Sequence, residues 1–176
     1  MNNWIVTIYD SEHDIQVPAI LCCESMEEAN NFVESTKTFY QNTDYLSDMV
    51  GEYVIVKNPG GLMKLDMLVE NGAVTEVAAL KIDKKLILNK EYVVCYRSYD
   101  FPAIYEMEDV ETLTDKLIDI YLSSHDWVEV DDYTYDDENG IYISIDFSDG
   151  HRIFAMSAKA KAIGNNKYYD SMEVIS

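Results

Sequence analysis

The sequence contains only three cysteines, and this scarcity excludes a secreted scaffold held together by disulfides. Cys22 and Cys23 are adjacent, and Cys95 makes the count odd, so no ordinary set of disulfides can be drawn. All three lie in apolar runs typical of strands, where a free thiol packs as a small hydrophobic group. The cysteines therefore indicate a reducing compartment.

Long apolar runs are also missing. No stretch approaches the roughly 20 apolar residues that a membrane span needs. The first ten residues, MNNWIVTIYD, have neither the basic region nor the long apolar region of a signal peptide. Because 48% of the residues are hydrophobic, the chain can still build a core. We therefore expect a soluble, cytoplasmic protein without a membrane partner.

Catalytic and metal-binding signatures are absent as well. The turn NPGG (58–61) lacks the lysine and the hydroxyl residue of a phosphate-binding loop. Residues 135–146 place oxygen-bearing side chains at several positions of an EF-hand calcium loop, but the first position is Tyr135 instead of a carboxylate. A cysteine–histidine pair could arise only through tertiary contacts, from Cys22 or Cys95 with His13, His125 or His151. We therefore expect no cofactor and no metal site.

Basic residues are few: 13 face 33 acidic residues, which gives a net charge of −20. The stretch from Asp100 to Asp149 holds 16 acids and a single base, Lys116, for a net charge of −15. Solubility of a small domain needs a magnitude of only about 2–8. Such an excess repels nucleic acid and anionic membranes and attracts basic partners. The charge therefore predicts a basic protein partner, with simple solubility as the alternative.

What the sequence does contain is an internal similarity. Residues 18–20 (PAI) recur as residues 102–104, and residues 51–61 (GEYVIVKNPGG) resemble residues 140–150 (GIYISIDFSDG). Around these segments, each half reads as strands, one helix and further strands. We therefore predict an α+β fold of two similar ββαββ modules, in which one helix packs on each antiparallel sheet.

The predicted modules are unequal in charge. The N-terminal module spans residues 1–80, a lysine-rich connector spans 81–90, and the strongly acidic C-terminal module spans 91–176. A twofold arrangement of two such modules also suits a homodimer.

Local patterns predict the helix starts and the buried faces. Ser25 and Glu28 form a capping box at the start of the first helix, and Asp109 is the expected N-cap of the second. Alternation over residues 141–147 predicts a strand with one buried face. The expected core stripe of the second helix comprises Val110, Leu113, Leu117 and Ile120.

The same periodicities place the acids and aromatic residues on the surface. Helical spacing puts three acids of the second helix outward, and strand alternation places Trp127, Glu129, Asp131, Tyr133 and Tyr135 on one side of the next strand. Trp127 alone is more typical of a core residue. We call the predicted partner-binding surface the acidic face; it comprises Glu111, Asp115, Asp119, Asp126, Glu129, Asp131, Asp132, Tyr133, Tyr135, Asp136, Asp137 and Glu138.

In size, charge and lack of catalytic motifs, the chain resembles the acidic inhibitors that phages and mobile elements use against host nucleases, the anti-CRISPR and antirestriction proteins. The resemblance is one of composition, and no residue is carried over from it. It implies an inhibitor, not an enzyme, that acts in the host cytoplasm by mimicking nucleic acid toward a basic nucleic-acid-binding protein such as a CRISPR nuclease. An immunity protein against a basic nuclease toxin, or an enzyme of unfamiliar type, are the alternatives.

Overall fold

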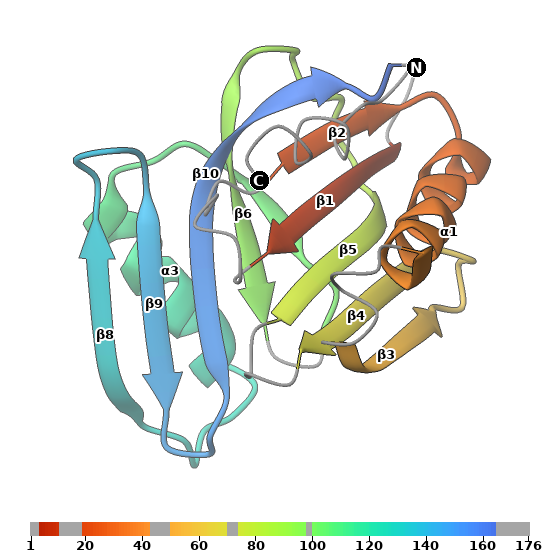
Figure 1. Ribbon diagram of the computed structural model, residues 1–176. Coiled ribbons are helices and arrows are strands. Elements are labelled where there is room, and N and C mark those ends of the chain that lie inside the picture. The colour runs from red at the N-terminus through yellow and green to blue at the C-terminus, as the bar shows by residue number, and fades with distance from the viewer. Residues whose placement is uncertain (1–3, 11–18, 43–49, 70–73, 98–99, 165–176) are drawn as a thin grey trace.

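A computed structural model describes residues 4–10, 19–42, 50–69, 74–97 and 100–164 (Figure 1). The first half contains β1 (Trp4–Asp10), β2 (Ala19–Cys23), α1 (Met26–Asn42), β3 (Val50–Lys57), β4 (Met63–Val69) and β5 (Val74–Lys81). The second half contains β6 (Glu91–Arg97), β7 (Ala103–Glu106), α3 (Val110–Leu122), β8 (Val130–Asp136), β9 (Tyr142–Phe147) and β10 (Arg152–Ala162).

The described residues form an α+β protein with one large, mostly antiparallel sheet, as the sequence predicts at the level of fold class. The strand order is β3-β4-β5-β1-β2 in the first half and β8-β9-β10-β6-β7 in the second. Both halves therefore share one strand order, and each has five strands instead of the four predicted. Neither helix, within the described ranges, has the length and apolarity that a membrane crossing requires.

Strand β10 joins the two halves, and Figure 1 shows it as a long, curved strand between them. Its first part pairs with β9, and its residues 160–162 pair in parallel with residues 20–22 of β2. Along its other edge, β10 pairs with β6. A single strand thus belongs to both halves of the sheet.

Three apolar clusters fill the molecule. One lies between α1 and the first half of the sheet, with Val6, Val33 and Leu65 at its centre. A second lies between α3 and the other half. The third joins inward-facing residues of both halves, among them Ile5 and Tyr96. Alternation along single strands produces this arrangement, because successive side chains enter different clusters. The order of layers is therefore α1, the first half of the sheet, the second half of the sheet and α3.

The predicted helix starts are confirmed. Ser25 Oγ accepts the backbone N–H of Glu28 at 3.0 Å, and the Glu28 carboxylate reaches back to the N–H of Glu24. Asp109 Oδ1 accepts the N–H of Thr112 at 3.0 Å, and this bond is the chief cause that lowers the pKa of Asp109. Each cap satisfies backbone donors that have no partner within the helix.

The core stripe of α3 differs from the prediction at its end. Val110, Leu113 and Leu117 are buried, but Ile120 is 37% exposed and Tyr121 takes the inward position. The strand prediction for 141–147 is confirmed, since Ile141, Ile143, Ile145 and Phe147 are all buried against α3.

The NPGG turn connects β3 to β4, as predicted. Asn58 Oδ1 accepts the N–H of Leu62 at 3.0 Å, and Gly61 has a φ of +83°, which favours glycine. The sequence similarity between 51–61 and 140–150, however, joins non-equivalent elements. Residues 51–61 contain β3 and its turn, whereas 140–150 contain β9, whose place in the strand order matches β4. The sequence Asn71-Gly72 is also typical of a hairpin turn, but it lies outside the described residues.

Candidate protein-binding face

All twelve residues of the acidic face are exposed. Helix α3 presents Glu111, Asp115 and Asp119 on its outer side, opposite the stripe that packs on β8 and β9. Loop residues Asp126 and Glu129 follow the helix, and Asp137 and Glu138 lie in the turn between β8 and β9. The structure therefore gathers the predicted residues around one helix and one hairpin.

The two tyrosines of β8 lie on the helix side of the sheet. Tyr133 is opposite Ile145 and Tyr135 is opposite Ile143, and both isoleucines are buried under α3. The tyrosine rings are stacked with centroids 6.4 Å apart, and they are 52% and 42% exposed. Acids of α3 surround them: Glu111, more than any other group, raises the pKa of Tyr135. Helix acids and strand tyrosines thus form one continuous surface.

The prediction that Trp127, Glu129, Asp131, Tyr133 and Tyr135 alternate onto one side is wrong in its first part. Strand β8 begins only at Val130, and a register shift between Val130 and Asp132 makes Asp131 an extra residue in the strand. Asp132 and Asp136 lie on the opposite side, across from Asp146 and Tyr142. The acidic face consequently wraps around the β8 edge instead of covering one side.

Trp127 is not a core residue. Its side chain is 72% exposed, the largest value among the large hydrophobic residues that the structure describes. It lies in the loop between α3 and β8, with Asp126 before it and Val128 buried after it. An exposed tryptophan inside an acidic loop adds an apolar contact to the predicted surface.

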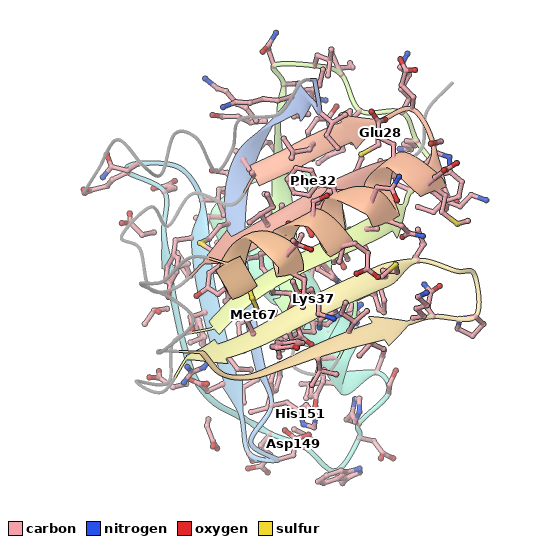
Figure 2. The ribbon with its side chains drawn as sticks, turned by 45° about the vertical axis from the view of Figure 1, so that its right-hand side comes forward. Glu28, Phe32, Lys37, Met67, Asp149 and His151 are labelled. Carbon is pink, nitrogen blue, oxygen red and sulfur yellow. The ribbon has the colours of Figure 1, made fainter. Side chains whose placement is uncertain are left out.

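A polar network that the sequence did not reveal fixes this loop. The Tyr121 hydroxyl donates to Asp149 Oδ2 at 2.7 Å. His151 Nδ1 lies 3.0 Å from the same oxygen, and Figure 2 shows His151 beside Asp149. Burial first, then Asp149, raises the pKa of Tyr121 to about 12. Burial alone would raise the pKa of Asp149, but hydrogen bonds from Tyr121 and His151 lower it overall. The His125 ring stacks on Tyr121 with centroids 4.3 Å apart.

Backbone bonds extend this network to the acidic face. The N–H of Ser148 donates to the Glu129 carbonyl at 2.9 Å, and the N–H of Glu129 donates to Ser148 Oγ at 3.0 Å. The loop after α3 is therefore tied to the turn between β9 and β10, and the carboxylates on it project from a fixed backbone.

Acids of the second half divide into two groups by their partners. Outside the acidic face, Arg97 pairs with Asp100, Lys90 with Glu106, Lys116 with Glu108 and Arg152 with Asp146, while Asp109 caps a helix and Asp149 holds Tyr121 and His151. None of the ten carboxylates of the acidic face forms an ion pair with another described residue. The acidic face therefore keeps its charge uncompensated, as does the single exposed Glu91 among the other described acids of this half.

The cysteines lie away from this surface. Burial raises the pKa of Cys95 and of Cys23 to about 12, so both thiols stay protonated and poorly nucleophilic. Cys22 is half-buried, and burial raises its pKa as well. No group of three His, Cys, Asp or Glu side chains within the described ranges is arranged to hold a metal ion. His13 lies outside the described residues.

A second feature missed from the sequence is a buried lysine. Lys64 of β4 is 5% exposed, and its Nζ lies 3.2 Å from Glu76 Oε2 and 3.5 Å from Asp66 Oδ1. It also donates to the Asp100 carbonyl at 2.9 Å. Alternation in MKLDMLV (63–69) carries the signal, since Lys64 and Asp66 share one side of a strand whose other side is apolar.

Glu76 gives this cluster a pH dependence. Burial, opposed by Lys64, raises the pKa of Glu76 from 4.5 to about 7. Between these values the folded state binds more protons than the unfolded state, so the free energy of unfolding falls as pH rises toward 7.

We expect Glu76→Gln to remove this fall. A shift of one pKa unit corresponds to about 1.4 kcal/mol. From pH 5 to pH 8, the free energy of unfolding of the wild type should therefore fall by at least that much more than that of the variant. Denaturant unfolding at both pH values measures the difference. Parallel pH profiles for the two proteins would show that Glu76 is ionised in the folded state throughout this range.

No known protein family, curated protein sequence or solved structure matches this chain. Its class is therefore defined by what the molecule itself presents: an α+β protein with a layered core and an exposed, uncompensated acidic face.

Proposed function

We propose that this protein inhibits a basic nucleic-acid-handling partner, such as a CRISPR effector nuclease, by occupying the partner's nucleic-acid site with its acidic face. The observation that supports this function is the division of the acids in the second half. Acids with structural roles are paired, while the ten carboxylates of the acidic face are exposed and unpaired. Charge held in the open favours an opposite charge on a partner.

Nucleic-acid mimicry explains why the partner should be a nucleic-acid-binding protein. Duplex DNA carries one charge per about 1.7 Å of its axis, and proteins answer it with lysine and arginine. A carboxylate can pair with an arginine through two parallel hydrogen bonds, as a phosphate does. Tyr133, Tyr135 and Trp127 add exposed aromatic rings beside the carboxylates. Tyrosine and tryptophan are enriched among residues that dominate binding energy at interfaces.

An immunity protein against a basic nuclease toxin would use the same surface, and the two functions differ only in the partner. A cleavage assay separates them. The protein is added to a panel of purified CRISPR nucleases and basic nuclease toxins, and substrate cleavage is followed with increasing salt. Inhibition of a CRISPR nuclease that weakens between 50 and 300 mM salt is the expected result. Inhibition of toxins alone would favour the immunity function, and inhibition of neither would overturn the proposal.

Asp115→Lys separates binding from stability. Glu111, Asp115 and Asp119 are spaced by four on α3, so they form two repulsive pairs. The reversal turns both pairs into attractive ones and should raise the free energy of unfolding by about 1 kcal/mol. Binding to the inhibited nuclease should fall by about tenfold, the equivalent of about 1.4 kcal/mol.

Asp115→Ala is the control, because it removes the charge without reversing it and should lie between the two proteins in both measurements. Thermal unfolding and titration binding provide the data. A stabilised variant that binds like the wild type would place α3 outside the interface.

We further infer that the two halves are copies of one module. The shared strand order supports this, as do Ala19 and Ala103, which open the second strand of each half opposite Ile8 and Cys95. Superposition of the two halves in an experimental structure tests the inference, and unrelated positions of β1 and β6 would overturn it.

A further inference from the structure

Among the described residues, no strand pairs with the outer edge of β7. Its residues 103–106 pair with β6, and it is the last strand in its half. The strand at the same place in the other half is β2, which is covered on both edges. There, residues 160–162 of β10 run parallel to β2, and the N–H of Ile163 donates to the Cys22 carbonyl at 3.0 Å.

Pairing registers show which residues would cover β7 in the same way. Trp4 of β1 is opposite Lys81 of β5, and Glu91 of β6 is opposite Lys159 of β10. Residues 82–84 therefore follow Lys81 as residues 160–162 of β10 follow Lys159. They do not pair with β7 as a strand, because the chain must turn there to enter β6 at Glu91. The link between the halves removes the strand that would close this edge.

A groove of about 550 Å³ lies where that strand is missing. Ile82, Asp83 and Lys84 line it together with residues 103–106 of β7. Buried residues of the central core, Leu80, Leu86 and Tyr92, also line it. The volume is within the range of ligand-binding pockets, roughly 300–1,000 Å³. The groove therefore combines an open strand edge with a lining that is partly apolar and partly charged.

Charge in the groove is more balanced than on the acidic face, because three basic and three acidic residues line it. Glu106 is paired with Lys90 at 2.6 Å, and Glu108 is paired with Lys116 at 2.9 Å. Of the remaining charged residues that line it, Lys81 and Lys84 are basic and Asp83 is acidic. Lys81 Nζ lies 5.4 Å from the centroid of the Trp4 ring. In a chain of net charge −20, this rim favours an acidic ligand.

We propose that the groove between residues 82–84 and β7 binds an extended, acidic peptide segment of another protein, which adds to the sheet as a strand beside β7. Backbone hydrogen bonds to the open edge provide affinity, as in other cases of strand addition. Alternate side chains of the segment point to Leu80 and Tyr92, and its carboxylates face Lys84. No residue that lines this site belongs to the acidic face, and the site does not depend on the function proposed for that surface.

Peptide titration of the full-length, isotope-labelled protein tests the proposal. The probe is an acetylated hexapeptide of alternating valine and glutamate, and a valine–lysine hexapeptide is the charge control. We expect amide signals of residues 82–84 and 103–106 to shift with the acidic peptide, and amide exchange at Ile104 and Glu106 to slow by at least tenfold. The basic peptide should bind at least tenfold more weakly. No shift in these segments at millimolar acidic peptide would overturn the proposal.

Two adjacent lysines provide matched variants. Lys84 lines the groove, whereas Lys85 is exposed and does not line it. Lys84→Glu should weaken binding of the acidic peptide by about tenfold, and Lys85→Glu by less than about twofold. Both variants change the net charge equally, so the difference between them reports the contact with Lys84. Equal effects would reduce the interaction to general charge attraction. A wild-type dimer that Lys84→Glu dissociates would identify a second copy as the occupant and also overturn the proposal.

Discussion

Reversing Asp131 and Asp137 to lysine should weaken binding of the inhibited nuclease by at least about a hundredfold. Each reversal removes one attraction and adds one repulsion, and a tenfold loss for each corresponds to about 1.4 kcal/mol. Both side chains are exposed, and no described hydrogen bond uses their carboxylates. Asp132 and Asp136 are less suitable, because they accept the backbone N–H groups of Tyr133 and Glu138 at 2.9 Å.

The matched control is Glu27→Lys with Glu34→Lys on α1, which changes the net charge by the same amount. Both residues are exposed in the less acidic half, whereas Glu28 is excluded because it caps the helix. The control should retain inhibition within about threefold and show a similar dependence on salt. Equal loss from both pairs would mean that overall charge, not the acidic face, drives binding. If reversing Asp131 and Asp137 left the affinity unchanged, the negative charge would serve only solubility.

Lys64→Met should cost about 3–5 kcal/mol of stability at pH 8, the usual loss when one partner of a buried ion pair is removed. The largely buried Glu76 carboxylate would then lack a cation, and the more exposed Asp66 would lose the same partner. A loss of this size is a large fraction of the 5–15 kcal/mol that stabilises most domains. At pH 5 the loss should be smaller, because Glu76 is protonated below its raised pKa of about 7.

Lys57→Met is the control for this variant, since Lys57 is exposed at the end of β3 in the same half. Its effect should stay within about 0.5 kcal/mol, as for most surface substitutions. Chemical denaturation at pH 5 and pH 8 measures both variants. Adding Glu76→Gln to Lys64→Met should recover part of the loss at pH 8. If the Lys64→Met protein were as stable as the Lys57→Met protein, the ion pairs of Lys64 with Asp66 and Glu76 would contribute nothing to the free energy of unfolding.

Local sequence patterns predicted what local forces determine. The caps at Ser25 and Asp109 follow from short-range hydrogen bonding, and the buried side of β9 follows from alternation. Exposure of the acidic face followed from charge, because an unpaired carboxylate is costly to bury.

Tertiary contacts decided the features that the sequence did not predict. Alternation could not anticipate the extra residue Asp131 in β8, because a bulge depends on the partner strand. Tyr121, and not Ile120, is buried, and its hydroxyl donates to Asp149 in the turn between β9 and β10. Helix periodicity alone does not reveal this partner. Lys64 could be placed on a buried side, but its partner Glu76 comes from another strand. The pairing of β2 with β10 had no local signal.

That pairing bears on how the protein is made. Ala160 pairs with Ile20, so β2 must wait for β10, which is synthesised much later. Until β10 is synthesised, β2, β6 and β9 each lack a neighbour, and unpaired strand edges invite association with other chains. Contacts between distant segments also slow folding. Synthesis that stops before Arg152 should therefore yield an aggregation-prone chain with neither half complete.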